Sequence, residues 1–283
     1  MRNRVIDAHH HLWHYSAEEY GWIDESMGVL RCDYLVAELE AELRAAGVDG
    51  AIAVQARQSL EETQWLLQIA AENAFVAGVV GWVPLADDRV SAVLERFAAQ
   101  PKLRGVRHVL QGEADEYMLR ADFQRGLGML REFGLAYDLL IHERQLASAI
   151  ELVDAHPAQT FVLDHLAKPL IRTQQMEPWA GLIGRLAERA NVYCKISGMV
   201  TEDDWGTWSA ASIGPYIETV LEAFGPHRLM YGSDWPVCLV ASSYGRWIGT
   251  VREAIAGLSE DEQLWIMGRT AAQAYNLKSE ENA

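Results

Sequence analysis

The sequence predicts an α/β protein whose single domain, residues 1–283, is a (β/α)8 TIM-type barrel with a C-terminal helical extension. Short runs rich in β-branched residues recur along the chain, amphipathic stretches separate them, and no linker or shift in composition divides the 283 residues. The length fits, because one barrel of this kind uses about 250 residues. An open, doubly wound parallel sheet is the alternative that the same alternation allows.

Eight apolar runs are expected to form the strands. Consecutive runs begin at least 24 residues apart, which leaves room for the crossover helix that joins two parallel strands. The runs begin at Val5, Ala51, Val76, Gly105, Ala136, Thr160, Val192 and Leu229. Eight is the number of strands that closes such a barrel.

Capping residues indicate where several helices begin and end. Asp33 is expected to cap a helix that ends at Gly47. Residues 59–62 and 259–262 both have a serine followed three positions later by glutamate, which is the spacing of a capping box. The second box is expected to open the final helix, which runs toward Tyr275.

The composition excludes several classes of function. The chain has 24 Lys and Arg residues against 40 Asp and Glu residues, a net charge of −16, so it lacks the positive charge that binds nucleic acid. We expect most of this acidic excess to lie on the solvated surface, apart from Asp234. No stretch has the length and apolar character of a signal peptide or membrane span, and the 3 Cys residues are scattered. We expect a cytoplasmic protein that binds neither nucleic acid nor membrane; the sequence assigns no oligomeric partner.

Polar residues gather where the predicted strands end. The active sites of (β/α)8 barrels lie at that end of the barrel, because the loops that follow the strands build them. In chain order, these residues are His9, His10 and His11, then Gln55 and Arg57, Trp82, Arg107 and His108, His142, Asp164 and His165, Lys195, and Ser233 and Asp234.

The first strand end has the pattern of a metal site. His9 and His11 are two residues apart, so their side chains are expected to face the barrel axis together, while His10 points away. Two neutral imidazoles hold a divalent cation from one side, and zinc suits such ligands. A plain polar strand end is the other explanation of this pair. Further ligands must come from other strands, and the candidates are His142, His165 and Asp234.

Three stretches of the chain carry a resemblance to a known family. They are residues 6–13 (IDAHHHLW), 161–169 (FVLDHLAKP) and 231–236 (YGSDWP). They resemble the amidohydrolase superfamily, and their order fits its lactonase branch, with most similarity to sugar-lactone hydrolases of the L-fuconolactonase and L-rhamnonolactonase type. Shorter similar stretches extend the resemblance over the whole chain, at residues 21–24, 54–62, 81–82 and 105–108.

The resemblance implies a hydrolase that opens a sugar aldono-lactone, best matched by an L-fuconolactone, to the sugar acid by metal-assisted attack of water. It implies one divalent metal ion, expected to be Zn²⁺, because the fourth strand has Val106, Arg107 and His108 where two-metal members have a carboxylated lysine. His142 occupies the place of a fifth-strand ligand that varies within the lactonase branch. The metal ligands carried over are His9, His11, His165 and Asp234.

Lactone hydrolysis requires a base for the attacking water and a donor for the departing ring oxygen. We expect Asp234 to accept the proton of water and to return it, and His165 or Lys168 to stabilise the oxyanion or to donate to the alkoxide. The expected substrate-binding residues are Gln55, Arg57, Trp82, Arg107, His108 and His142. Trp13, Tyr20 and Trp22 lie in a long loop after the first strand, where aromatic residues either pack within the loop, as is commoner, or cover the site.

Other functions compete with this interpretation. A dicarboxylate lactonase that works without metal and a metal-dependent decarboxylase belong to the same superfamily. A dicarboxylate pocket calls for several arginines, whereas Arg57 and Arg107 are the clear ones at strand ends. A catalytically silent sugar-binding protein would require a broken set of His and Asp residues, and the set is intact.

Overall fold

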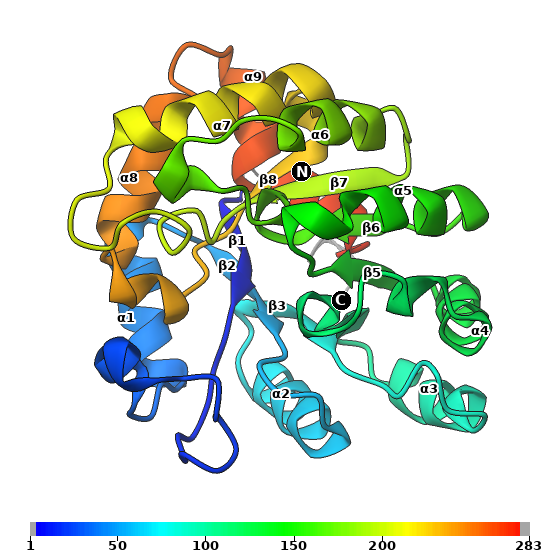
Figure 1. The fold of residues 1–283 in the computed structure, drawn as a ribbon. Coiled ribbons are helices and arrows are strands. Elements are labelled where there is room, and N and C mark those ends of the chain that lie inside the picture. Colours follow the sequence, from blue (N-terminus) through cyan, green and yellow to red (C-terminus); the bar gives the residue numbers. More distant parts are fainter. Residues whose placement is uncertain (1–3, 278–283) are drawn as a thin grey trace.

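The computed structural model of the protein describes residues 4–277. Eight parallel strands stand side by side in chain order, and helices surround them (Figure 1). The order from first to last strand has no reversal, so the predicted (β/α)8 barrel is confirmed and the doubly wound sheet is excluded. The strands are β1 (Ile6–His10), β2 (Gly50–Val54), β3 (Val76–Gly81), β4 (Leu103–His108), β5 (Ala136–Leu139), β6 (Phe161–Leu163), β7 (Val192–Ile196) and β8 (Leu229–Tyr231).

The outer layer consists of eight helices, of which the first seven connect successive strands and the eighth follows the last strand. They are α1 (Val36–Ala46), α2 (Leu60–Glu72), α3 (Val90–Ala98), α4 (Ala121–Met129), α5 (Leu146–Ala155), α6 (Trp179–Ala187), α7 (Ala210–Phe224) and α8 (Tyr244–Ala254). The predicted C-terminal extension follows as α9 (Glu260–Leu264), a π-helical turn η10 (Trp265–Arg269) and α10 (Thr270–Ala274).

Short 3-10 helices fill the loops between these elements. They are η1 (Glu25–Leu30), η2 (Leu110–Gly112), η3 (Tyr117–Leu119), η4 (Leu130–Phe133), η5 (Glu143–Gln145), η6 (Asp164–Ala167), η7 (Ile171–Thr173), η8 (Pro226–Arg228) and η9 (Val237–Val240). Most of them lie where chemistry is expected, in loops that follow strands.

The predicted helix caps have mixed outcomes. The box formed by Ser259 and Glu262 is present in full at the start of α9. The expected cap at Asp33 is wrong, since α1 begins at Val36 after Leu35. The Asp33 carboxylate instead accepts the backbone N–H of Tyr15, which ties down the loop after β1.

The box at the start of α2 is half formed. The Ser59 hydroxyl accepts the N–H of Glu62, as predicted. The Glu62 carboxylate does not return to Ser59, because it accepts the backbone N–H groups of Ala56 and Arg57 instead. It thereby fixes the turn that leads out of β2 toward the site.

The barrel closes between β1 and the segment that follows β8. His10 and Trp235 form a parallel bridge, the N–H of His11 donates to the Trp235 carbonyl at 2.7 Å, and the N–H of Asp234 donates to the His9 carbonyl at 2.8 Å. Closure therefore brings Asp234 beside the two histidines of the first strand.

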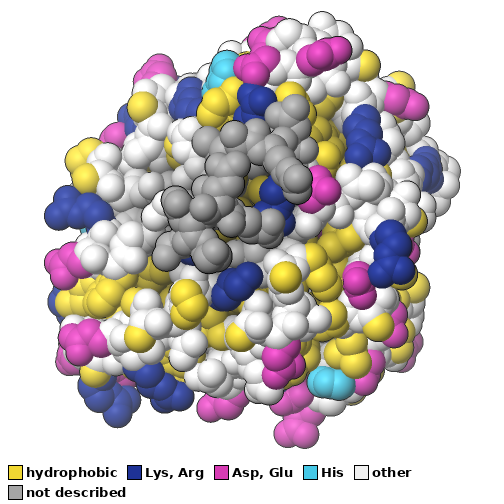
Figure 2. All heavy atoms as spheres, turned by 180° about the vertical axis from the view of Figure 1, so that it is seen from behind, with side chains coloured by type: hydrophobic (Ala, Val, Ile, Leu, Met, Phe, Trp, Pro, Cys, Tyr) yellow, Lys and Arg dark blue, Asp and Glu magenta, His cyan; other side chains and the backbone are white. Residues whose placement is uncertain are grey.

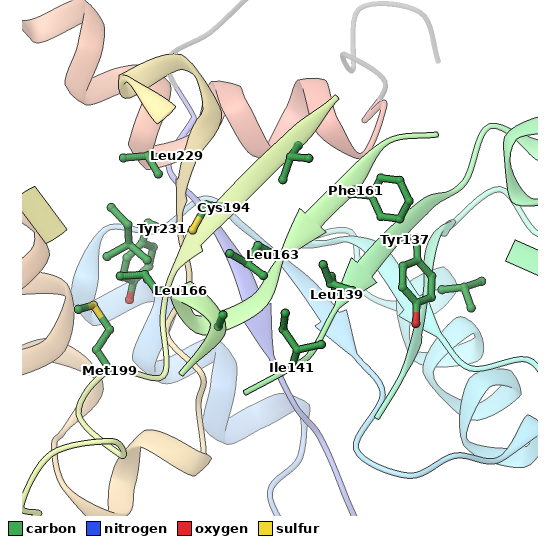
Figure 3. Packing of buried hydrophobic residues seen from close by; sticks show 14 of the residues in the cluster. Tyr137, Leu139, Ile141, Phe161, Leu163, Leu166, Cys194, Met199, Leu229 and Tyr231 are labelled. Atoms are coloured by element: carbon green, nitrogen blue, oxygen red, sulfur yellow. The ribbon is translucent and has the colours of Figure 1, made fainter. Parts of the chain in front are cut away.

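The side chains between the strands and the helices form an apolar layer, here called the outer core. On β5 to β8 it contains Tyr137, Leu139, Phe161, Leu163 and Leu229, which alternate with inward-facing residues (Figure 3). These residues are completely buried. Because side chains point alternately to the two faces of each strand, the protein has two buried regions. One is the outer core between the strands and the helices, and the other is the space that the strands enclose.

Inside the strands, the end of the barrel at which the strands begin is apolar. Ile6, Ile52, Val80 and Met230 pack there, and α10 together with Tyr275, which follows it, closes the floor. Toward the site the interior becomes charged, and its charged members, here called the polar axis, are Asp138, Asp164, Lys195 and Arg107.

Most carboxylates lie outside the buried set, as expected, but Asp234 is not the only exception among the described residues. Asp7, Asp138, Asp164 and Glu62 are also buried. Each has a close donor or cation, which is the condition under which a carboxylate tolerates burial. The alternating pattern of a strand therefore hides charge that a count of residues assigns to the surface.

The outer surface carries charges of both signs. On the face opposite that of Figure 1, Lys and Arg side chains are interspersed with Asp, Glu and hydrophobic side chains (Figure 2). Among residues 4–277, no helix combines the length and apolar character needed to cross a membrane.

Candidate active site

Four of the predicted site residues meet at the mouth of the barrel. The Nε2 atoms of His9 and His11 are 3.2 Å apart. One oxygen of Asp234, Oδ1, lies 3.7 Å from Nε2 of His9, 3.5 Å from that of His11 and 3.9 Å from that of His165. All four side chains are buried, so three imidazoles from two strand ends point at one carboxylate oxygen out of bulk water.

This donor set fits a metal ion. Two nitrogens bound to one tetrahedral zinc are about 3.3 Å apart, given Zn–N bonds of about 2.0–2.1 Å. Nδ1 of His11 lies 2.8 Å from the Val54 carbonyl, which accepts its hydrogen and leaves the lone pair on Nε2. Two overlapping triads have ligand atoms within 4.8 Å of one another: His9, His11 and Asp234, and His9, Asp164 and His165. His10 belongs to neither.

Left-handed backbone places two of these residues. His165, Leu166, Ala167 and Lys168 have φ values of 53°, 54°, 60° and 50°, and Asp234 has 56°. Such conformations cost a non-glycine residue about 1–3 kcal/mol each and persist where the surroundings fix them. Here the indole N–H of Trp179 donates to the Leu166 carbonyl at 2.7 Å. A conformation this unfavourable, repeated four times after β6, serves to turn His165 toward Asp234.

Two glycines leave room for the histidines. Gly198 has φ +62°, and a Cβ there would lie 2.4 Å from Nδ1 of His165. A Cβ on Gly232 would lie 2.8 Å from Cβ of His9. Side chains at these positions would push both imidazoles out of place.

Charge and burial set the protonation states of the catalytic candidates. Burial raises the pKa of Asp234, but His165, His11 and Lys168 outweigh it and hold that pKa below its ordinary value. Burial lowers the pKa of His165 to about 4, while its Nδ1 lies 2.9 Å from the Ser197 hydroxyl. At neutral pH the site therefore contains an ionised carboxylate beside a neutral imidazole.

Arg107 and Gln55 line the same mouth. Nη1 of Arg107 lies 3.0 Å from Oδ2 of Asp164 and 3.4 Å from Nε2 of His9, and Nη2 donates to the Gln55 carbonyl. The Gln55 amide donates to the Arg107 carbonyl at 3.3 Å, while its Oε1 is buried with no hydrogen-bond partner among the described residues. That oxygen is an acceptor available to a substrate hydroxyl.

Trp82 and His108 belong to a separate aromatic group. The Trp82 indole N–H donates to Nδ1 of His108 at 3.4 Å, and Nε2 of His108 lies 3.0 Å from Glu113. Tyr117 stacks on the His108 ring with 5.3 Å between centroids. Both nitrogens of His108 are therefore engaged by the protein, and Glu113, which the sequence did not single out, orients the ring.

Arg57 holds the loop that follows β1. Its guanidinium forms an ion pair with Glu19 and lies 5.6 Å from the centroid of the Tyr20 ring. Trp13 and Tyr20 of this loop are buried and 5.5 Å apart, whereas Trp22 is 43% exposed. Trp13 also stacks near His11 at 6.4 Å, so the loop reaches the histidine cluster.

His142 and Lys168 lie at the rim. His142 is half-buried and belongs to neither of the triads that could hold a metal ion. Burial, followed by the nearby charge of Lys168, lowers its pKa. Lys168 lies 3.6 Å from Glu202.

Sequence reasoning missed the polar residues beneath the cluster. Lys195 stood at a predicted strand end but received no role, and Asp138 and Ser197 were not considered. Lys195 is completely buried, within 2.9 Å of Asp164 and 3.1 Å of His9. A single charged residue in an otherwise apolar strand, as in β5 and β7, is the signal that would have found Asp138 and Lys195, while Ser197, just after β7, has no such signal.

Known proteins resemble this chain over nearly its whole length. The model of a family described as amidohydrolase matches residues 6–277. An "L-fucono-1,5-lactonase" of Burkholderia multivorans is 42% identical over 96% of both chains, and another from Burkholderia ambifaria is 32% identical over 96% of this chain and 95% of its own. A crystal structure of a B. multivorans amidohydrolase with bound zinc superposes with a TM-score of 0.93 at 40% identity, covering 97% of this chain and 100% of that one.

Proposed function

The chain belongs to the amidohydrolase family, and from that premise we propose that it is a lactonase that opens a sugar lactone of the L-fuconolactone type to the sugar acid. The observation that carries the proposal is the convergence of His9, His11 and His165 on one oxygen of Asp234 at the mouth of the barrel. The two curated lactonases aligned with nearly the whole chain support the choice of substrate.

Asp234 is the base in the proposed reaction. Water loses a proton to its carboxylate and attacks the lactone carbonyl carbon. The tetrahedral oxyanion then collapses, the ring C–O bond breaks, and the departing oxygen takes the proton back from Asp234. The depressed pKa of Asp234 keeps the carboxylate ionised and ready to accept the first proton at neutral pH.

His165 and Arg107 assist at the carbonyl. The neutral imidazole of His165, held from behind by Ser197, is placed to donate to oxygen, and the Arg107 guanidinium supplies a fixed positive charge near the same point. Fixed donors and charges aimed at a developing oxyanion lower its energy without reorganisation. Lys168 lies at the rim with Glu202 and has the weaker claim to this role.

We further propose that one divalent ion, Zn²⁺, is held by His9, His11 and Asp234 with His165 beside them. When bound there, zinc supplies Lewis-acid polarisation of the carbonyl. The donor atoms and their spacing support this assignment, as does the zinc in the B. multivorans structure.

The charges at the mouth favour a neutral lactone over a dicarboxylate. Arg107 is already paired with Asp164, and Arg57 is already paired with Glu19. A substrate carboxylate would have to displace one of these partners. Gln55, with its unpartnered oxygen, and the rings of Trp82 and Trp22 suit the hydroxyls and the C–H face of a sugar ring.

An acid-release screen with a pH indicator tests the substrate. Purified protein is given L-fuconolactone, other aldono-lactones and a pyrone dicarboxylate, and Asp234→Asn prepared in parallel measures contaminating activity. We expect the wild type to turn over sugar lactones and to leave the dicarboxylate unchanged. Turnover of the dicarboxylate alone, or equal rates from both preparations, contradicts the proposal.

The metal is tested separately. Metal content by elemental analysis is set against lactonase rate across preparations treated with graded amounts of chelator. We expect the rate to follow zinc content. Full activity at substoichiometric metal would refute the metal part and leave the lactonase assignment intact.

A further inference from the structure

Lys195 stands directly behind the proposed metal site. Its Nζ hydrogen bonds to Asp138, lies 3.1 Å from Nδ1 of His9 and lies 2.9 Å from Oδ1 of Asp164. All four side chains are completely buried. A lysine ammonium has three N–H hydrogens and no lone pair, so it can only donate hydrogen bonds to these neighbours.

The contact with Lys195 decides which nitrogen of His9 carries the ring hydrogen. Donors stand at both ring nitrogens of His9, since Nζ of Lys195 lies 3.1 Å from Nδ1 and Nη1 of Arg107 lies 3.4 Å from Nε2. The ammonium is the closer donor, and Nη1 of Arg107 has a nearer acceptor in Asp164 at 3.0 Å, so Nδ1 is the acceptor and the hydrogen of neutral His9 is on Nε2. Burial favours the neutral ring, since it lowers the pKa of His9 well below its ordinary value. Nε2 then donates to Nε2 of His11 at 3.2 Å, whose own hydrogen is on Nδ1 and bonded to Val54. One continuous chain of donors runs from Lys195 to Val54.

In this arrangement the Nε2 lone pair of His9 is not available to a metal. Binding through Nε2 requires the hydrogen to be on Nδ1. Oδ1 of Asp164 is placed to accept it, since this buried oxygen lies 3.4 Å from Nδ1 and has the Lys195 ammonium, at 2.9 Å, as its other neighbour. A carboxylate behind a histidine is the usual support of a metal-binding imidazole.

We propose that Lys195 and Asp164 compete for Nδ1 of His9, and that this competition sets how tightly the site binds metal. Lys195 holds His9 in the form that donates to His11, and Asp164 supports the form that binds metal. Lys195 is thus a positioning residue that opposes metal uptake, although it does not touch the metal position. The inference rests on the metal assignment of the proposed function.

Zinc affinities of metal-free variants, measured by competition with a chelating dye, test the proposal. We expect Lys195→Met to bind zinc about 10- to 100-fold more tightly than the wild type, and Asp164→Asn to bind it about 10- to 100-fold more weakly. Opposite signs are the signature, because a purely structural role for both residues would weaken binding in both variants. Weaker or unchanged binding by Lys195→Met overturns the proposal.

Lys168→Met is the matched control. It removes a positive charge near His165 that makes no hydrogen bond to His9, so it isolates the effect of charge alone. We expect a change of at most about fivefold. An increase in affinity equal to that of Lys195→Met would assign the whole effect to charge and overturn the role of the hydrogen bond.

Nitrogen-15 NMR of the histidine rings tests the same point without a substitution at Lys195, which keeps the proposal testable if that variant does not fold. In the metal-free wild type, with His9 assigned by comparison with His9→Asn, the hydrogen is expected on Nε2. A hydrogen on Nδ1 overturns the proposal. This result does not depend on lactonase activity or on zinc, so its failure is distinguishable from failure of the proposed function.

Discussion

The outer core and the polar axis are equally hidden from water but are built on opposite principles. Leu139 and Asp138 are neighbours on β5, and both are completely buried. Leu139 faces the helices and packs among apolar side chains, whereas Asp138 faces the barrel interior and binds Lys195 and Tyr275. One strand thus serves stability with one face and chemistry with the other.

Burial has a different effect in each of the two regions. Apolar burial in the outer core stabilises the fold by about 25 cal/mol for each Å² removed from water. The polar axis gains little in this way, because the desolvation of two carboxylates, a lysine and an arginine offsets much of their attraction. The polar axis instead holds fixed charges beneath the site. Substitutions in the polar region should therefore lower activity more than stability, and substitutions in the outer core should do the reverse.

The largest effect is expected where the polar region reaches the substrate. Asp234→Asn keeps the shape of the side chain and removes the base, so kcat/KM for lactone hydrolysis should fall by about 10²- to 10⁴-fold. The melting temperature should change little. Steady-state kinetics and thermal unfolding by circular dichroism measure the two quantities. A variant that retains near-wild-type turnover would remove Asp234 from the mechanism.

A cavity in the outer core should give the reverse result. Leu186 on α6 is completely buried in this layer, and Leu186→Ala should lower the free energy of unfolding by about 2–5 kcal/mol. The kcat/KM of the folded fraction should stay within about twofold, since stability and catalysis reside in separate regions. Urea unfolding and kinetics on the same sample give both values. A parallel loss of kcat/KM would show that the two regions are coupled.

Glu62 differs from the carboxylates of the polar axis, because backbone N–H groups rather than a buried cation mainly hold it. Burial raises its pKa from 4.5 to about 7. The folded state therefore favours the protonated form, and stability is lost as the pH rises from about 4.5 to above 7. The loss amounts to about 3 kcal/mol, at 1.36 kcal/mol for each pKa unit.

Glu62→Gln removes this titration while retaining an acceptor for the N–H groups of Ala56 and Arg57. The variant should match the wild type near pH 4.5 and exceed its stability by up to about 3 kcal/mol at pH 8. Urea unfolding of both proteins across this range gives the difference directly. A difference that does not change with pH would mean that Glu62 titrates at its ordinary pKa.

The smallest effect is expected at the rim, outside both regions. Trp22 is 43% exposed, so Trp22→Ala should change the free energy of unfolding by less than about 0.5 kcal/mol. If its ring stacks on the sugar, KM should rise about 2- to 10-fold, the equivalent of about 0.5–1.5 kcal/mol. Val29→Ala, in the same loop and 46% exposed, is the matched control and should leave KM unchanged. A similar rise in KM in both variants would indicate that the substitutions disturb the loop rather than a contact with the sugar.

The sequence was sufficient for the barrel because the information is local. A run of β-branched residues predicts each strand. His9, His11, His165 and Asp234 lie at the ends of predicted strands, and a closed barrel brings these ends together. The support beneath them is not local. Lys195 meets Asp138 across 57 residues of chain, and only the folded barrel shows that the two side chains face one another.

Two further features of the structure could not be predicted from patterns in the sequence. The left-handed turn from His165 to Lys168 contains no glycine, so local propensity predicts the opposite conformation. The Glu62 carboxylate had two competing sets of N–H groups within reach, and the tertiary position of the β2 turn decided between them. Such choices depend on packing rather than on spacing.

The floor of the barrel has a consequence for how the protein is made. Tyr275 follows α10, near the C-terminal end of the chain, and its hydroxyl donates to Asp138 at 2.7 and 2.8 Å, which anchors the lower end of the polar axis. A ribosome delivers all eight strands before it delivers this tyrosine. A nascent chain can therefore assemble its strands while Asp138 still lacks its tyrosine donor, and the site acquires its final electrostatics only after α10 and Tyr275 have packed on the floor.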